Sequence, residues 1–298
     1  MDVYLYGQTL LSSINLLNEK YPEPDGYAEI KESYSLPGGE TINAAIVLSN
    51  FGYRTKIDGP FLGVKTKDPL IVYFQKFNVD YSGLHYDSTF DGVQDLVLID
   101  KNSRTVFGKF QKYFSDGTKR WTAPDKAAIQ SAKIVSIDPF FGDESVLAAK
   151  YCVELNKQYA AIDCPYNEFI HQRSAVNIIS NEYIQNNYPK ENAEELFHKY
   201  TGASDGLVVF TFGSREILFG RKNSPVKKII PYKVNVVSTL GAGDTFRAGI
   251  LYALLNKFDD EMTVKFAAAT AATVCTKFPM ALNPPALDEV RNLARNNH

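Results

Sequence analysis

The chain has 298 residues, of which 45% are hydrophobic and 22% charged, as in a globular protein that can bury a large core. Its 32 basic and 34 acidic residues give a net charge of −2, so the charge balance predicts no nucleic-acid or membrane partner. The N-terminal segment lacks the basic start and apolar run of a signal peptide, and no apolar run reaches the roughly 20 residues that span a bilayer. We therefore expect a cytoplasmic protein.

Short apolar runs alternate with helical patterns along most of the chain. The predicted strands are 3–7, 133–138, 159–165, 176–180 and 206–213, and the predicted helices are 40–52, 144–157 and 192–202. Strands that are apolar throughout and alternate with helices indicate a mostly parallel sheet with helices on both faces. We therefore expect a single α/β domain over residues 1–298, built as a three-layer αβα sandwich.

Residues 26–36 and 92–110 break this alternation. Both have the regular polar and apolar alternation of exposed strands, and Asn102–Ser103 is typical of a turn inside the second region. We interpret the two regions as a small separate sheet. The alternative is a pair of long surface loops, which the regular alternation disfavours.

The cysteines and histidines show no ligand pattern. Cys152, Cys164 and Cys275 are odd in number, and their spacing fits neither a zinc site nor a disulfide framework. We interpret them as reduced thiols in the protein interior. The four histidines are scattered along the chain, so we expect each to be structural or exposed.

A group of small residues, Gly241-Ala242-Gly243, lies between a predicted strand at 234–237 and a predicted helix that begins near Asp244. Small residues let a ligand approach the backbone, and the free amides and dipole of a helix N-terminus stabilise negative charge. A carboxylate there would repel a bound phosphate, but it could take a proton from an attacking hydroxyl. The alternative is that Asp244 caps the helix, which leaves the three small residues unexplained.

Two segments resemble the signatures of the ribokinase (PfkB) family of carbohydrate kinases. "PGGETINAAIVLSNFG" at 37–52 is similar to its signature G-G-x-x-x-N-x-A, and "STLGAGDTFRAG" at 238–249 is similar to D-T-x-G-A-G-D-x-F. The two occur in the family's order, and the strands between them are similarly arranged. The resemblance implies a ribokinase-like fold that transfers the γ-phosphoryl group of ATP, with Mg²⁺, to a hydroxyl of a sugar, polyol or nucleoside.

The resemblance also implies roles for particular residues. Asp244 would be the catalytic base, and the anion hole would be formed by Gly241, Ala242 and Gly243. The phosphoacceptor site would contain Ser12, Gly38, Gly39, Asn43 and Asp138. The nucleotide would contact Asn181, Thr211, Gly213 and a wall from Ala271 to Asn283, and the metal ligands would be Asn181 and Glu182. A β lid formed by about residues 13–36 and 86–112 would close over the substrate and pair two subunits in a homodimer.

Four positions depart from the family pattern. Ser12 and Ser238 replace aspartates, Ile184 replaces the glutamate of N-x-x-E, and Glu216 replaces the second glycine of T-x-G-x-x-G. The loss of the acid at position 238 predicts a weak response to potassium, because a cation there would lose a negative ligand. The departures also leave open a second reading, a catalytically degenerate member that binds a small metabolite or nucleotide as a sensor.

Position 12 bears on the identity of the acceptor. A carboxylate there would accept two charge-assisted hydrogen bonds from neighbouring hydroxyls, whereas the Ser12 hydroxyl is shorter and uncharged. Unless Asp138, Glu40 or a lid residue compensates, we expect an acceptor with a different group at this point. That group would be a less hydroxylated ring, a base or an anionic substituent.

Overall fold

The structure is a computed structural model, and it describes residues 1–101, 103–109, 113 and 118–296. Within these residues the main sheet has eight strands in the order β12-β11-β10-β9-β8-β7-β1-β4. Its strands are β1 (Val3–Tyr6), β4 (Thr55–Asp58), β7 (Ile134–Ile137), β8 (Tyr159–Ile162), β9 (Val176–Ser180), β10 (Leu207–Thr211), β11 (Ile217–Gly220) and β12 (Lys227–Ile229). The six neighbouring strands β10, β9, β8, β7, β1 and β4 run parallel to one another. Strands β11 and β12 extend the β10 edge of this sheet as an antiparallel hairpin.

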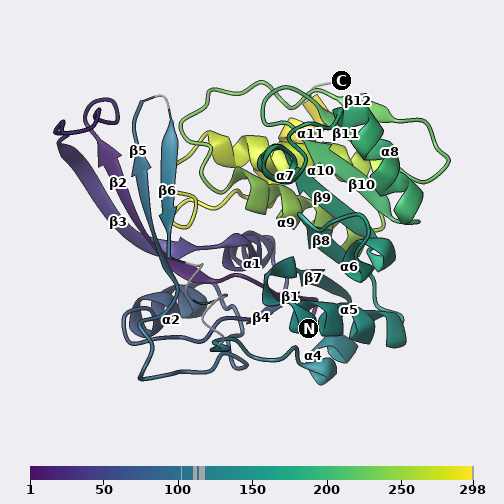
Figure 1. Ribbon diagram of the computed structural model, residues 1–298, viewed down its shortest axis with the longest axis horizontal. Helices are drawn as coiled ribbons and strands as arrows, with labels where there is room; N and C mark the ends of the chain where they lie inside the picture. Colours follow the sequence, from purple (N-terminus) through teal and green to yellow (C-terminus); the bar gives the residue numbers. More distant parts are fainter. Residues whose placement is uncertain (102, 110–112, 114–117, 297–298) are drawn as a thin grey trace.

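Helices cover both faces of this sheet (Figure 1). One layer contains α1 (Glu40–Asn50), α2 (Lys67–Lys76), α9 (Ala242–Leu255), α10 (Asp260–Cys275) and α11 (Leu287–Asn296). The other contains α4 (Lys126–Ser131), the short 3₁₀ helix η1 (Pro139–Phe141), α5 (Asp143–Glu154), α6 (Phe169–Arg173), α7 (Asn181–Asn187) and α8 (Ala193–Ala203). A hydrophobic core lies between the sheet and each helix layer, and strand β1 contributes to both. Val3 and Leu5 pack against the layer that contains α1, and Tyr4 and Tyr6 pack against the layer that contains α5. The predicted three-layer αβα sandwich is confirmed.

Several helices begin at a side-chain cap, which explains why the chain turns into a helix directly after a strand or loop. Asn192 accepts hydrogen bonds from two amides at the start of α8, and Asp125 does the same at the start of α4. Ser180 caps α7 immediately after β9, and Asp259 caps α10. Each cap satisfies amides that have no partner inside the helix.

A second, four-stranded sheet has the order β3-β2-β5-β6 and lies to one side of the sandwich (Figure 1). It consists of β2 (Leu10–Leu17), β3 (Ile30–Gly38), β5 (Gln94–Ile99) and β6 (Arg104–Gly108), and we call it the lid. The separate small sheet is confirmed, although its first strand begins at Leu10, earlier than predicted. Asn102 of the predicted turn and residues 110–112 of the predicted lid lie outside the described residues.

The predicted strand at 234–237 is wrong. These residues form no strand, and Val236 and Val237 are 57% and 60% exposed. The amides of Val237 and Ser238 instead bond to the carbonyl of Cys275 at the end of α10, at 2.7 and 3.2 Å. The valines suggest a β-strand, but the backbone of this segment bonds to a helix terminus and not to a strand.

Among the residues that the structure describes, no helix has the length and apolar character needed to cross a bilayer.

Candidate active site

A cavity of about 560 Å³ lies between the lid and the main sheet. One wall comes from the lid, through residues such as Leu10, Val97 and Val106. The opposite wall comes from the carboxyl ends of parallel strands, where Asp163 and Ser180 are exposed to the cavity. The carboxyl edge of a parallel sheet is where ligands of α/β proteins bind.

The start of helix α9 forms the floor of the cavity. Gly241 precedes the helix with φ 81°, a left-handed conformation that favours glycine. Both Gly241 and Gly243 line the cavity, and a Cβ added at Gly243 would meet nothing within 4 Å. The first amides of the helix have no intrahelical partner and form the positive end of its dipole. This open cradle therefore fits an anionic group such as a phosphate.

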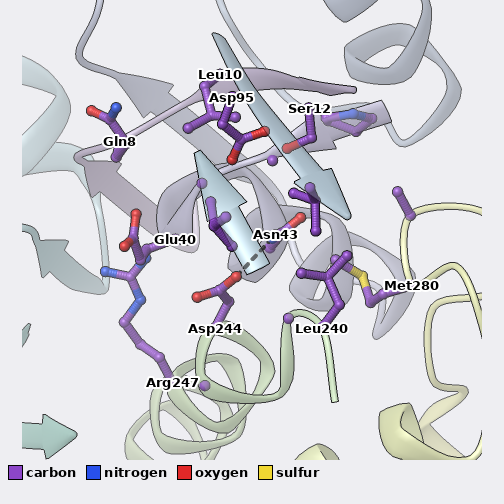
Figure 2. Close-up of a pocket in the computed structure, with 18 of the residues that line it drawn as sticks. Gln8, Leu10, Ser12, Glu40, Asn43, Asp95, Leu240, Asp244, Arg247 and Met280 are labelled. Atoms are coloured by element: carbon purple, nitrogen blue, oxygen red, sulfur yellow. Dashed lines mark hydrogen bonds between the residues drawn. The ribbon is translucent and has the colours of Figure 1, made fainter. Parts of the chain in front are cut away.

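Asp244 lies in the first turn of α9 and lines the same cavity. It does not cap the helix, because Gly241 is the N-cap residue and no side chain makes the capping bond. Its Oδ2 accepts a hydrogen bond of 2.7 Å from Nδ2 of Asn43 on α1 (Figure 2). Burial raises the pKa of Asp244, while the bond from Asn43 and the charge of Arg247 oppose the rise.

An ion pair lies behind this floor. Arg247, one turn after Asp244, is 1% exposed and binds Asp138, which is 0% exposed. Asp138 also accepts bonds from the amide of Gln8 at 2.7 Å and the hydroxyl of Thr41 at 3.0 Å. Asp138 was expected to face the sugar, but it is not among the described residues that line the cavity. Its carboxylate instead joins β7 to the start of the lid, to α1 and to α9.

Glu40 is a further acid in the cavity, at the start of α1. Its side chain lies close to Asp244 and Arg247 (Figure 2). Burial, reinforced by the negative charges of Asp138 and Asp244, raises the pKa of Glu40 to about 8. A neutral Glu40 at pH 7 limits the negative charge around the cradle.

The predicted acceptor residues Ser12, Gly38, Gly39 and Asn43 are brought together in the cavity wall. A Cβ at Gly38 would lie 2.1 Å from Oγ of Ser12, so a glycine is needed for the two lid strands to approach this closely. Asn43 lies one turn into α1 and carries the bond to Asp244. The lid, α1 and α9 therefore all contribute side chains to the part of the cavity around Asp244.

The predicted nucleotide and metal residues divide into two groups. Thr211, at the end of β10, and Glu182, the proposed metal ligand in the first turn of α7, line the cavity. The nucleotide residues Asn181, Gly213, Ala271 and Asn283 are not among the described lining residues, and neither is Ala242 of the predicted anion hole. Asn181 accepts a bond of 3.1 Å from Arg215. Within the predicted 271–283 stretch, the residues that line the cavity are Pro279, Met280 and Ala281.

The residues present fit a magnesium ion that is bound mainly through phosphates. Among the described residues, no three His, Cys, Asp or Glu side chains are grouped to hold a metal. Glu182 and Asp163 line the cavity, but both carboxylate oxygens of Asp163 already accept bonds from Ser180, which leaves Glu182 as the freer acid. Mg²⁺ commonly binds one or two carboxylates, substrate phosphates and water. Ile184, at the position of the family's glutamate, is buried in the core beneath α7. Glu182 is therefore the acid of α7 that faces the cavity.

Four charged residues that line the cavity were given no role from the sequence: Asp95, Arg104, Asp163 and Arg247. Arg247 could have been found, because it follows Asp244 by three positions and therefore lies on the same face of the helix. Asp95 and Arg104 lie on lid strands, and their place depends on strand pairing that the sequence does not reveal.

Comparison with known proteins extends these observations. The family model described as pfkB family carbohydrate kinase matches residues 178–286. A 5-dehydro-2-deoxygluconokinase of Shouchella clausii is 36% identical over 67 residues, which are 22% of this chain and 21% of that relative. A nucleoside kinase of Methanothermobacter thermautotrophicus is 26% identical over 297 residues, which cover 92% of this chain and 89% of the relative. The match to the first relative therefore spans about a fifth of its length.

The fold has solved counterparts over its full length. The structure of Arabidopsis thaliana ribokinase complexed with ribose and ATP superimposes with a TM-score of 0.82 at 17% identity, covering 99% of this chain and 98% of that one. The fold is thus ribokinase-like, with a cavity beneath a β lid. The resemblance to the pfkB family of carbohydrate kinases is confirmed by the match of the family model to residues 178–286 and by the similarity to relatives that are named as kinases.

Proposed function

We propose that the protein transfers the γ-phosphoryl group of ATP to a hydroxyl of a sugar, polyol or nucleoside. The observation that carries this proposal is the Asp244 carboxylate beside the open cradle at the start of α9, held by Asn43 at 2.7 Å. A pure binding site for an anion gains nothing from a carboxylate there. A kinase needs a base beside the place where the phosphoryl group arrives.

In this proposal Asp244 takes the proton of the acceptor hydroxyl as that oxygen attacks the phosphoryl group. Burial raises the pKa of Asp244, which makes the carboxylate a stronger base than an exposed aspartate. Asn43 fixes the orientation of the carboxylate, and the amides at Gly241 and Gly243 stabilise the charge of the transferring group. The lid keeps water away, so that ATP is not simply hydrolysed.

The nucleotide would lie toward β9, β10 and α7, where Thr211 and Glu182 line the cavity. Mg²⁺ would be held by Glu182 together with the phosphates, and it would spread their negative charge. Asn181, Gly213, Ala271 and Asn283 stay proposed contacts that would meet a nucleotide extending beyond the cavity. Ser238 would hold a monovalent cation only weakly, because its hydroxyl, which accepts a bond of 3.2 Å from the amide of Leu240, carries no negative charge.

The lid would also pair two subunits. Leu96 and Phe107 lie opposite each other on β5 and β6 and are 38% and 44% exposed. They alternate with Val97 and Val106, which face the cavity, so they lie on the outer face of the lid. An apolar outer face supports a homodimer through the lid.

The test is ATP consumption by the wild type with a panel of sugars, polyols and nucleosides, with thermal unfolding recorded for the same ligands. We expect acceptor-dependent turnover that requires Mg²⁺ and disappears in Asp244→Asn. A sensor would instead show ligand-dependent stabilisation, equal in both proteins, without ADP formation. That result would replace the kinase proposal with the second reading.

A further inference from the structure

The lid places one acid directly against Ser12. Strands β2 and β5 are parallel neighbours, and Ser12 is paired in register with Asp95. Both side chains line the cavity, and Figure 2 shows them side by side on the lid, across the cavity from Asp244 on α9. Position 12 on β2 therefore has no carboxylate of its own, but Asp95 on the neighbouring strand β5 provides one beside it.

Asp95 is not satisfied by the protein around it. Its Oδ1 is buried and has no hydrogen-bond partner within the part of the chain that the structure describes. Burial raises the pKa of Asp95 to about 6, and the neighbouring Ser12 opposes the rise. A buried, unpaired carboxylate oxygen costs free energy unless a ligand supplies the missing donor.

The surroundings narrow the chemistry of that ligand. Val97 and Val106, paired across β5 and β6, line the same face of the lid and offer no hydrogen bond. Arg104 and Gln8 also line the cavity, but no described side chain donates to Oδ1 of Asp95, so a ligand can supply the missing donor. A carboxylate has two acceptor oxygens and no donor when ionised, so two adjacent hydroxyl groups match it.

We propose that Asp95 is a specificity-determining residue that binds two adjacent hydroxyls of the acceptor, while Asp244 on the opposite wall takes the proton of a third. The inference rests on the proposed kinase function. It makes the acceptor a vicinal diol, such as a sugar ring or the ribose of a nucleoside. The expectation of a less hydroxylated ring, which followed from Ser12 alone, is thereby withdrawn, because Asp95 is the compensating lid residue.

The test compares acceptors that differ only in the diol: D-ribose with 2-deoxy-D-ribose, and adenosine with 2′-deoxyadenosine. Binding is measured by calorimetry and phosphorylation by ADP release, for the wild type and for Asp95→Asn. We expect the variant to bind the favoured diol about tenfold to a hundredfold more weakly, since a bond to a charged group is lost, and to bind its deoxy partner as before. Asp91→Asn is the matched control, because Asp91 is 56% exposed and pairs with Lys65 outside the cavity.

A second variant guards against a merely structural effect. Ser12→Asp in the Asp95→Ser background returns the carboxylate to β2, and we expect it to restore preference for the diol, whereas Ser13→Asp on the outer face should not. Equal preference for diol and deoxy acceptors in wild type and Asp95→Asn would overturn the inference, as would failure of the wild type to bind either diol. Diol binding that depends on Asp95 without any turnover would support the inference and count against the kinase proposal alone.

Discussion

The floor of the cavity, residues 241–247, and the lid that faces it differ in how their acids are satisfied. On the floor, Asp244 is bound by Asn43; Arg247 binds Asp138, although its Nε and Nη2 have no partner in the described chain. On the lid, Asp95 has a buried oxygen without a partner in the described chain. The protein thus fixes the geometry of the proposed chemistry itself and leaves part of the lid to be completed by a ligand.

The same two regions also differ in how closely they resemble the signatures of the pfkB family. The floor carries the G-A-G-D signature without change, whereas position 12 of the lid departs from the family pattern. A fixed floor and a variable lid would let one reaction serve different acceptors. Variants in the floor should therefore lower kcat, whereas variants in the lid should weaken the binding of the acceptor.

The largest effect is expected from the floor. Asp244→Asn should lower kcat by about a hundredfold to ten-thousandfold, the usual contribution of a general base, with little change in the KM for ATP. Steady-state kinetics with the best acceptor of the panel measures it, and Asp68→Asn on the exposed face of α2 serves as the control. A variant with near wild-type kcat would show that the floor has no base at Asp244.

The next largest effect is expected from the buried ion pair between Arg247 and Asp138. Arg247→Met should destabilise the fold by about 3–5 kcal/mol, because Asp138 would be left as an unpaired buried charge. Denaturant unfolding measures the loss, and Lys126→Met, which breaks an exposed pair with Glu154, should cost less than about 1 kcal/mol. Similar losses in the two variants would mean that the buried pair does not hold the floor in place.

The smallest effect is expected from Glu40, which lies at the start of α1 and lines the cavity. Its pKa in the folded protein is raised to about 8, so the side chain is neutral at pH 7 and becomes negative as the pH rises further. The new charge would lie near Asp244, Asp138 and Arg247 and would oppose phosphate binding. We expect kcat/KM to fall as the pH rises through about 8 in the wild type, and to stay flatter in Glu40→Gln, which keeps the neutral form.

The stability of the two proteins gives an independent check on Glu40. Because the folded pKa is raised, the favourable contribution of protonated Glu40 is complete below its ordinary pKa of 4.5 and is lost as the pH rises toward about 8. Unfolding at pH 5 and pH 9 should therefore show wild type losing more stability than Glu40→Gln. Parallel losses would place the pKa of Glu40 near its ordinary value.

The sequence predicted the sandwich and the separate lid, because these depend on local patterns such as apolar strands, helical spacing and polar and apolar alternation. It also predicted that a glycine-rich turn precedes α9, and the anion-binding role of that turn stays a prediction. It failed at 234–237, where valines suggested a strand but the backbone bonds to the end of α10. It also assigned Asp138 to the acceptor, since burial and the partnership with Arg247 depend on four segments that meet only in the fold. The sequence also did not identify Asp95 as a site residue. Its place beside Ser12 depends on the pairing of two strands that are far apart in the sequence.

That register also has a consequence for the order of folding. Leu11 is paired with Gln94, so joining β2 to β5 closes a loop of about 80 residues, which costs more chain entropy than either lid hairpin alone. Helix α1, strand β4 and helix α2 all lie within that loop. We therefore expect the pairing of β2 with β5 to form late in refolding and to open early in native-state hydrogen exchange, so selectivity would be lost while the sandwich is still intact.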